Sequence, residues 1–221
     1  MATRVVLLAG ASGSGKTSLC RRVGLPVLAL DHFYRDGDDP QLPHRFGIVD
    51  WDHPDSWDAG AAMATLTLLS SNGAADVPTY DIATSRRTGH SRLDLAGAPV
   101  LVAEGIFAAC LVTACHEAGL LADALCLQMH PAQTFVRRLA RDLTQSRKPP
   151  LTLVRRGLGL ARGERAQVQR WVDAGCRPVS LAEAETTLRA LRTSTSTAEA
   201  PSDPTDHRGP AQKGGGSGSV V

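Results

Sequence analysis

Lysine and aromatic residues are scarce in this chain of 221 residues. Three lysines accompany 21 arginines, and Phe, Trp and Tyr together make up 4% of the sequence. The five cysteines are odd in number and include no C-x-x-C pair, which argues against a disulfide framework and against a zinc site. No apolar run approaches the roughly 20 residues of a membrane span, and Met1 leads directly into a strand pattern instead of a signal peptide. These absences predict a cytoplasmic protein with reduced thiols and no membrane partner.

Length and composition predict one folded domain. Hydrophobic residues make up 43% of the chain and charged residues 21%, which is ordinary for a globular protein. A chain of this length can bury one core and carry an appended lid or tail. Residues 193–221 are rich in Thr, Ser, Pro and Gly and contain almost nothing apolar. We therefore expect a domain over 1–192 and a disordered tail over 193–221.

Charge is distributed unevenly along the chain. Residues 31–58 hold eight Asp and two Arg, a net charge of −6. Residues 130–192 hold twelve Arg and one Lys against two Asp and three Glu, a net charge of +8. An acidic and a basic segment together suit a site for a metal ion and a polyphosphate, whereas a nucleic-acid surface more often has one basic face. We expect no nucleic-acid partner.

One octapeptide has the pattern G-x-x-x-x-G-K-T. It follows an apolar run that suits a buried parallel strand and precedes a stretch that can form a helix, which is the context of a phosphate-binding P-loop. Glycines let several backbone N–H groups converge on one anion, and the helix N-terminus adds partial positive charge. We expect Lys16 to reach the β- and γ-phosphates of ATP and Thr17 to offer a hydroxyl to Mg²⁺. The residues expected to cradle the nucleotide are Gly10, Ser12, Gly13, Ser14, Gly15, Lys16 and Thr17.

Apolar segments predict strands that alternate with helices. The expected strands are 4–9, 26–30, 77–80, 99–103 and 124–129, and the expected helices are 17–22, 61–69, 107–120, 131–145, 151–172 and 181–191. Asp55 or Ser56 would cap the second helix, and 81–94 is predicted to be an exposed loop. This alternation indicates an α/β fold with a doubly wound, parallel five-stranded sheet. Because such sheets bind ligands beyond the carboxyl ends of their strands, the P-loop, Asp31 and Glu104 should converge.

Four further segments carry polar and aromatic residues in a recognisable order. They are Asp31-His32-Phe33-Tyr34-Arg35-Asp36, Asp50-Trp51-Asp52-His53-Pro54-Asp55-Ser56-Trp57-Asp58, Pro78-Thr79-Tyr80-Asp81 and Ala103-Glu104-Gly105-Ile106. Together with the P-loop they resemble the uridine kinase family, which has D-x-F-Y, D-H-P-D, P-x-Y-D and E-G-I segments in this order. The resemblance covers residues 4–148. It implies a P-loop NTPase fold of the nucleoside/nucleotide-kinase type with a helical lid, here near 143–165.

The resemblance implies a role for three acidic residues. Asp31 matches the catalytic base, which accepts a proton from the attacking hydroxyl. Glu104 matches the acidic residue of the metal site, and Asp52 matches the residue that holds the ribose hydroxyls. Other roles are a loop cap for Asp31, a salt bridge for Glu104, and an N-cap or solvated acid for Asp52.

The resemblance also implies contacts to the acceptor and to the transferred phosphate. Tyr80 and Trp51 would flank a flat base, although aromatic residues are more often part of a core. The segment from Arg137 to Asp142 resembles the family's R-R-x-x-R-D helix, whose guanidinium groups offer paired donors to phosphate oxygens; an ordinary solvated helix face is the alternative. We expect Arg138 at the substrate, and Arg141, as a catalytic residue, at the nucleotide together with Arg147.

Two departures from the family pattern concern the acceptor and the lid. The family has a His five residues after the Tyr of its base-binding loop, where this chain has Ser85; Arg87 is retained as an expected substrate contact. The family's R-G-R lid sequence aligns with Ser146-Arg147-Lys148. The phosphate-binding half of the pattern is therefore matched more fully than the base-reading half.

The sequence as a whole predicts an ATP- and Mg²⁺-dependent kinase. The expected reaction is transfer of the γ-phosphoryl group to a primary hydroxyl of a small molecule, a nucleoside such as uridine or cytidine. Ser85 leaves open a kinase of the same fold for a sugar phosphate or a pantothenate-like alcohol. A nucleotide-binding regulatory protein without catalysis is a further alternative, against which Asp31 and Glu104 argue. Whether the chain forms a homo-oligomer is also left open.

Overall fold

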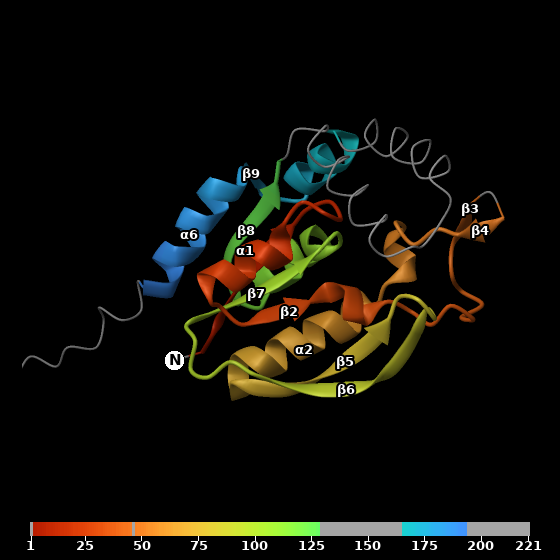
Figure 1. The fold of residues 1–221 in the computed structure, drawn as a ribbon, viewed down its shortest axis with the longest axis horizontal. Coiled ribbons are helices and arrows are strands. Elements are labelled where there is room, and N and C mark those ends of the chain that lie inside the picture. The colour runs from red at the N-terminus through yellow and green to blue at the C-terminus, as the bar shows by residue number, and fades with distance from the viewer. Residues whose placement is uncertain (1, 46, 129–164, 194–221) are drawn as a thin grey trace, which may run out of the picture.

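A five-stranded parallel sheet forms the centre of the computed structural model, which describes residues 2–45, 47–128 and 165–193 (Figure 1). The strand order is β2-β7-β1-β8-β9, and each neighbouring pair runs parallel. The predicted doubly wound α/β fold is confirmed. The strands are β1 (Arg4–Ala9), β2 (Val27–Ala29), β7 (Val100–Gly105), β8 (Leu121–Leu127) and β9 (Arg177–Val179).

Helices cover both faces of this sheet. On β1, Val5 and Leu7 belong to one buried cluster and Val6 and Leu8 to another, and all four side chains have 0% exposure. Such a strand, buried on both faces, has no polar alternation, which is why the sequence shows it as a continuous apolar run. The helices are α1 (Lys16–Val23), α2 (Ala59–Asn72), α3 (Val112–Glu117) and α6 (Leu181–Thr193), with 3₁₀ turns η1 (Leu30–Phe33), η2 (Pro54–Ser56) and η3 (Ala108–Leu111).

A long antiparallel hairpin lies outside the central sheet, beside α2 (Figure 1). It consists of β5 (Ala74–Asp81) and β6 (Arg86–Asp94). The prediction of a loop over 81–94 is therefore wrong. Nearly every residue of β6 is exposed, so the strand has no apolar alternation by which the sequence could reveal it. A second, smaller ribbon joins β3 (His44–Arg45) to β4 (Ile48–Val49).

Two further differences concern a strand and a helix cap. The predicted strand 77–80 is not part of the central sheet, because it belongs to β5 of the hairpin. The fifth strand of the sheet is β9 instead, which was not predicted because three residues are too few to show a period. The cap of α2 is Asp58, whose carboxylate accepts a hydrogen bond from the Ala61 N–H at 2.9 Å. Neither Asp55 nor Ser56 caps this helix; the Ser56 hydroxyl instead donates to the His53 carbonyl at 2.7 Å.

Several predicted features lie outside the described residues. They are the helix over 131–145, most of the segment 151–172 and of the lid 143–165, and the tail after Thr193. Of the segment 151–172, the part from residue 165 onward is helical. Four of the five cysteines are buried. Within the ranges given above, no helix has both the length and the apolar character needed to span a bilayer.

Candidate active site

Strand order brings three predicted site segments to one edge of the sheet. β7 lies between β1 and β2, with Ala9 opposite Gly105 and Ala29 opposite Glu104. The P-loop follows β1, Asp31 follows β2, and Glu104 is close to the end of β7. A Cβ at Gly105 would lie 3.0 Å from Leu30 Cβ and 3.5 Å from Asp31 Oδ1. The end of β7 and the segment after β2 therefore approach each other closely here. The expected convergence of the three segments is confirmed.

The P-loop has the backbone that its glycines predict. Gly13 and Gly15 have φ values of 81° and 93°, in the region that favours glycine. A Cβ at Gly10 would lie only 2.9 Å from Ser14 Oγ, so the loop is closed tightly on itself. Ser14 is 1% exposed, and its hydroxyl has no hydrogen-bond partner among the residues that the structure describes. A bound anion would supply the acceptor that this buried donor needs.

Lys16, Thr17 and Glu104 form one polar cluster at the loop. The Lys16 ammonium donates to the Gly10 carbonyl at 2.8 Å and lies 3.7 Å from Glu104 Oε2. The Thr17 hydroxyl donates to Glu104 Oε1 at 2.8 Å. Burial lowers the pKa of Lys16 below its ordinary value, and the nearby carboxylates of Glu104 and Asp31 partly offset this effect. A buried ammonium, an alcohol and a carboxylate are thus held together, a combination suited to a polyphosphate and its counter-ion.

The donor set at Thr17 and Glu104 fits a magnesium ion. Hydroxyl and carboxylate oxygens are hard ligands, and Mg²⁺ is usually held by one or two carboxylates together with substrate phosphates and waters. No group of three or more His, Cys, Asp or Glu side chains that could hold a metal exists within the described ranges. A metal at this edge would therefore depend on phosphate oxygens for part of its coordination.

A cavity of about 490 Å³ opens beside the P-loop. Its lining combines Lys16 and Thr17 with Arg22 and Leu181. Arg22 also pairs with Glu185 of α6 at 3.0 Å, so α6 is fixed against α1 at this point. Sequence reasoning missed Arg22 and Leu181, because nothing in the primary structure indicates that α6 begins next to the P-loop.

A second cavity, of about 660 Å³, lies next to Asp52. Ile106 and Phe107, which follow β7, line it together with Arg170 and Trp171. The Trp171 indole N–H donates to the Ile106 carbonyl at 3.0 Å, which fixes the helical residues 165–173 against the end of β7. Arg170 was not predicted as a site residue, since it was one of many arginines in a basic segment. This second cavity is the candidate acceptor cavity.

Tyr34 lies among the aromatic residues that surround this site. Its ring centroid is 5.6 Å from that of Trp51, 5.8 Å from that of Tyr80 and 5.9 Å from that of Phe107. Burial raises the pKa of Tyr34, and the nearby carboxylates of Asp31 and Asp52 raise it further. The Tyr34 hydroxyl therefore stays protonated near both carboxylates. The D-x-F-Y segment contains Tyr34, but sequence reasoning gave this residue no role of its own.

Tyr80 and Arg87 attach the β5–β6 hairpin to the loop that follows η1. The Tyr80 hydroxyl donates to the Arg35 carbonyl at 2.9 Å, and the Arg87 backbone N–H donates to Asp36 Oδ1 at 2.7 Å. The Arg87 guanidinium also lies 3.7 Å from Asp58 Oδ2. Both residues thus stand near the aromatic cluster, and their contact with an acceptor stays a prediction. Arg138, Arg141 and Arg147 lie outside the described residues.

Comparison with known proteins gives a consistent result. The chain is 32% identical over 173 residues to a uridine kinase of Deinococcus deserti, covering 72% of this chain and 77% of that protein. It is 29% identical over 154 residues to a uridine kinase of Staphylococcus aureus, covering 66% and 70%. No protein-family model matches the chain.

A solved structure supports the fold assignment. It is a candidate fructose transport system kinase from Silicibacter sp. TM1040, with a TM-score of 0.53 and 20% identity. The alignment covers 75% of this chain and 85% of that one. The likeness extends over most of both chains and agrees with the parallel sheet and P-loop described above. With the identity and coverage of the Deinococcus relative, the P-loop, Asp31 and Glu104 place this chain in the uridine kinase family.

Proposed function

We propose that this protein transfers the γ-phosphoryl group of ATP to the primary hydroxyl of a nucleoside, in a reaction that requires Mg²⁺. The observation that carries the proposal is the meeting of Lys16, Glu104 and Asp31 at one edge of the sheet, next to a P-loop cavity and an acceptor cavity. The relatives named uridine kinase support a nucleoside as the acceptor.

The P-loop would hold the nucleotide by backbone N–H groups and by the Lys16 ammonium. Because Lys16 is buried, its charge is weakly screened, and its attraction for the β- and γ-phosphates is correspondingly strong. Thr17 and Glu104 are the residues that would hold Mg²⁺, which when bound neutralises phosphate charge. The Ser14 hydroxyl would donate to a phosphate oxygen and so satisfy its hydrogen bond.

Asp31 would act as the general base of the transfer. A bond forms between the acceptor oxygen and the γ-phosphorus, the bond from that phosphorus to its bridging oxygen breaks, and the acceptor proton passes to the Asp31 carboxylate. Asp52 offers two acceptor oxygens to the vicinal hydroxyls of a ribose, at the wall of the acceptor cavity. Tyr34, as a protonated donor near both carboxylates, would keep them oriented.

The remaining roles rest on the sequence pattern. Arg138 would contact the substrate, whereas Arg141 and Arg147 would neutralise charge on the transferred phosphoryl group and the nucleotide. Guanidinium groups suit this task because they donate paired hydrogen bonds to phosphate oxygens. Tyr80 and Arg87 would border the acceptor.

Replacing the proposed base tests the function. Asp31→Asn keeps the shape of the side chain and removes its basicity, so turnover should fall about 10²–10⁴-fold with little change in ATP affinity. The measurement is ADP release with a panel of nucleosides, sugar phosphates and small alcohols. Asp76→Asn is the matched control, because Asp76 is an exposed residue of β5 paired with Arg92, and it should keep full activity.

Two results would contradict this proposal. If no acceptor raises ADP release above the background of ATP hydrolysis, the protein is not a kinase of the tested classes. If Asp31→Asn loses ATP binding and keeps residual transfer, Asp31 has a structural or metal-binding role instead of acting as the base.

A further inference from the structure

We propose that His32 is a positioning residue for the acceptor: it accepts a hydrogen bond from the backbone N–H of Tyr80 and so holds Tyr80 in place beside the acceptor cavity. The inference rests on the proposed function and adds a residue to that same site. The D-x-F-Y pattern leaves its second position open, so sequence reasoning assigned His32 no role.

A hydrogen bond joins His32 to the β5–β6 hairpin. The Tyr80 N–H donates to His32 Nδ1 at 3.2 Å, across 48 positions of the chain. An imidazole nitrogen that accepts a hydrogen bond carries no proton, so the neutral ring has its proton on Nε2. In this contact His32 therefore acts through the lone pair of one defined atom.

The turn that carries His32 is fixed by the core of the protein. Leu30 and Phe33 belong to the same turn, η1, and are buried at 1% and 0% exposure. The Phe33 carbonyl also accepts a hydrogen bond from the Asp58 N–H at 2.9 Å, which attaches the turn to the start of α2. The accepting nitrogen and the proposed base, Asp31, thus stand on one fixed turn of backbone.

The ladder of the hairpin is irregular where Tyr80 stands. Thr79 pairs with Gly89, whereas the next residue, Tyr80, pairs with Arg87. Thr88 is therefore an extra residue of β6. Such bulges bend a strand and change the direction of its side chains, and they are common next to active sites. Because the pairing with β6 shifts at this point, the hydrogen bond to η1 supplies a second fixed point for this part of β5.

A series of contacts connects Tyr80 to the acceptor cavity. The Tyr80 hydroxyl donates to the Arg35 carbonyl at 2.9 Å, and its ring centroid lies 5.8 Å from that of Tyr34. The Tyr34 ring in turn lies 5.9 Å from that of Phe107, which lines the acceptor cavity together with Asp52. A displacement of Tyr80 would therefore reach the wall of this cavity through packed rings.

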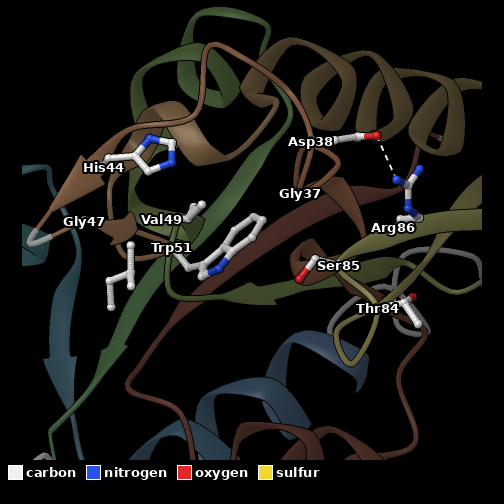
Figure 2. A pocket seen from close by; sticks show the side chains of 10 residues that line it. Gly37, Asp38, His44, Gly47, Val49, Trp51, Thr84, Ser85 and Arg86 are labelled. Carbon is white, nitrogen blue, oxygen red and sulfur yellow. Dashed lines mark hydrogen bonds and ion pairs between the residues drawn. The ribbon is translucent and has the colours of Figure 1, made fainter.

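Other contacts hold the turn at the end of the hairpin. The Gly37 N–H donates to the Ser85 carbonyl at 2.7 Å. The Arg86 guanidinium pairs with Asp38 Oδ2, also at 2.7 Å, which Figure 2 draws as a dashed line. A third cavity, of about 720 Å³, lies beside Ser85 between this turn and the β3–β4 ribbon. The hairpin should therefore stay attached when its hydrogen bond to η1 is lost.

Two substitutions at position 32 separate the accepting atom from the bulk of the side chain. His32→Asn keeps an acceptor, because Asn Oδ1 is attached to Cγ as Nδ1 is in histidine. His32→Leu keeps a branched Cγ and removes the acceptor.

The kinetic test compares the two variants with uridine as the acceptor. We expect His32→Leu to raise KM for uridine about two- to tenfold, the factor that the loss of one hydrogen bond typically corresponds to, and to change kcat and KM for ATP by less than about twofold. His32→Asn should keep all three values within about twofold of the wild type. His90→Leu is the matched control, because His90 is exposed on the same hairpin, and it should leave all three values unchanged.

Hydrogen exchange gives a measurement that does not depend on turnover. An amide proton whose hydrogen bond is lost exchanges faster with solvent. The Tyr80 amide should therefore exchange faster in His32→Leu than in the wild type, and His32→Asn should keep it protected. Thermal unfolding shows whether each variant is folded. If His32→Leu does not fold, His32→Ala takes its place, because alanine also lacks an acceptor and adds no bulk.

Several results would overturn the inference. Equal increases in KM for uridine in His32→Leu and His32→Asn would show that the ring matters and not the accepting atom. A fall in kcat together with a rise in KM for ATP would show a general disturbance around Asp31. An unchanged KM for uridine, or an unchanged exchange rate of the Tyr80 amide, in His32→Leu would show that the hydrogen bond does not position Tyr80.

The outcomes also separate this inference from the kinase proposal. If no nucleoside is phosphorylated, the kinase proposal fails, and calorimetric titration with uridine then decides on His32. Weaker binding of uridine to His32→Leu than to His32→Asn would support the positioning role. Equal binding to both variants, or no binding to the wild type, would overturn it.

Discussion

Two parts of the site are built differently. The nucleotide half consists of the P-loop, α1 and Glu104, and the acceptor half consists of Asp52 with its loop and the β5–β6 hairpin. Lys16 and Glu104 are 8% and 9% exposed and belong to elements that the central sheet fixes in register. Asp52 and Arg87 are exposed and stand on a loop and on a hairpin outside that sheet. The first half is therefore positioned by the core of the fold, and the second by contacts at its surface.

This difference indicates which half can change without loss of the fold. The acceptor half is held by individual hydrogen bonds, such as Tyr80 to Arg35 and Gly37 to Ser85, each contributing about 0.5–1.5 kcal/mol to stability. The nucleotide half shares its residues with the buried sheet, so a substitution there also changes the packing of the core. A new acceptor specificity can arise by altering the hairpin and the loops while phosphate binding stays the same.

Of the changes that compare the two halves, the one in the nucleotide half should cost the most turnover. Lys16→Ala removes the buried ammonium that would face the γ-phosphate, and loss of one such preorganised group typically costs about 10²–10³ in kcat. Thermal unfolding should show that the domain stays folded. Arg92→Ala is a control, because this exposed arginine of β6 pairs only at 3.5 Å with Asp76. Turnover close to that of the wild type would refute the role of Lys16.

An intermediate effect, on the KM for the acceptor but not on that for ATP, is expected from a change in the acceptor half. Gly37→Ala introduces a Cβ that would lie 2.9 Å from Ser85 Cβ, so the hairpin must move away from the loop, at a cost of about 1–3 kcal/mol in the free energy of unfolding. KM for the acceptor should rise while KM for ATP stays the same. Gly60→Ala is the control, since its Cβ would meet its nearest atom at an ordinary 3.6 Å. An equal rise in both KM values would show that the two halves are coupled.

The smallest effect is a difference in the alkylation rates of two cysteines, one in the nucleotide half and one at the acceptor cavity. Burial raises the pKa of Cys20, in the nucleotide half, to about 12, and it raises the pKa of Cys110 as well. Because the thiolate is the reactive form, alkylation of both should speed up as pH rises towards these values. Cys110 is exposed and lines the acceptor cavity, so it should be labelled before Cys20, and an acceptor nucleoside should slow its labelling. Mass spectrometry after iodoacetamide treatment measures the order in which the two cysteines are labelled.

Equal labelling of Cys20 and Cys110 would overturn the comparison. Cys20 is a residue of α1, the helix that follows the P-loop, and has 0% exposure, so its modification requires that part of the core to open. Such a result would show that the nucleotide half is as mobile as the acceptor half.

The sequence predicted the sheet and the P-loop because their signals are local. Residues 5–9 form one continuous apolar run, and the eight residues of the P-loop carry both their backbone geometry and their chemistry in consecutive positions. The ends of β2 and β7 were located in the same way, each as an apolar run that stops at an acidic residue. The start of α6 is likewise specified by neighbouring residues, because Ser180 and Glu183 exchange hydrogen bonds at 3.3 and 2.8 Å.

The sequence could not predict the features that depend on long-range packing. β6 is polar along its length and becomes a strand only because β5 pairs with it. Tyr34 gains its position among Trp51, Tyr80 and Phe107 from three other segments. None of these contacts leaves a period or a motif in the primary structure.

What the sequence alone determined is the chemistry of phosphate binding and the family, because a P-loop and its following helix are specified by neighbouring residues. What only the tertiary structure decided is the shape of the acceptor side. The contact of Arg86 with Asp38 joins residues 48 positions apart, and the cavity beside Ser85 exists only where the hairpin meets that loop. The physical reason is that a cavity is the space left between segments, and its size follows from their packing and not from any one of them.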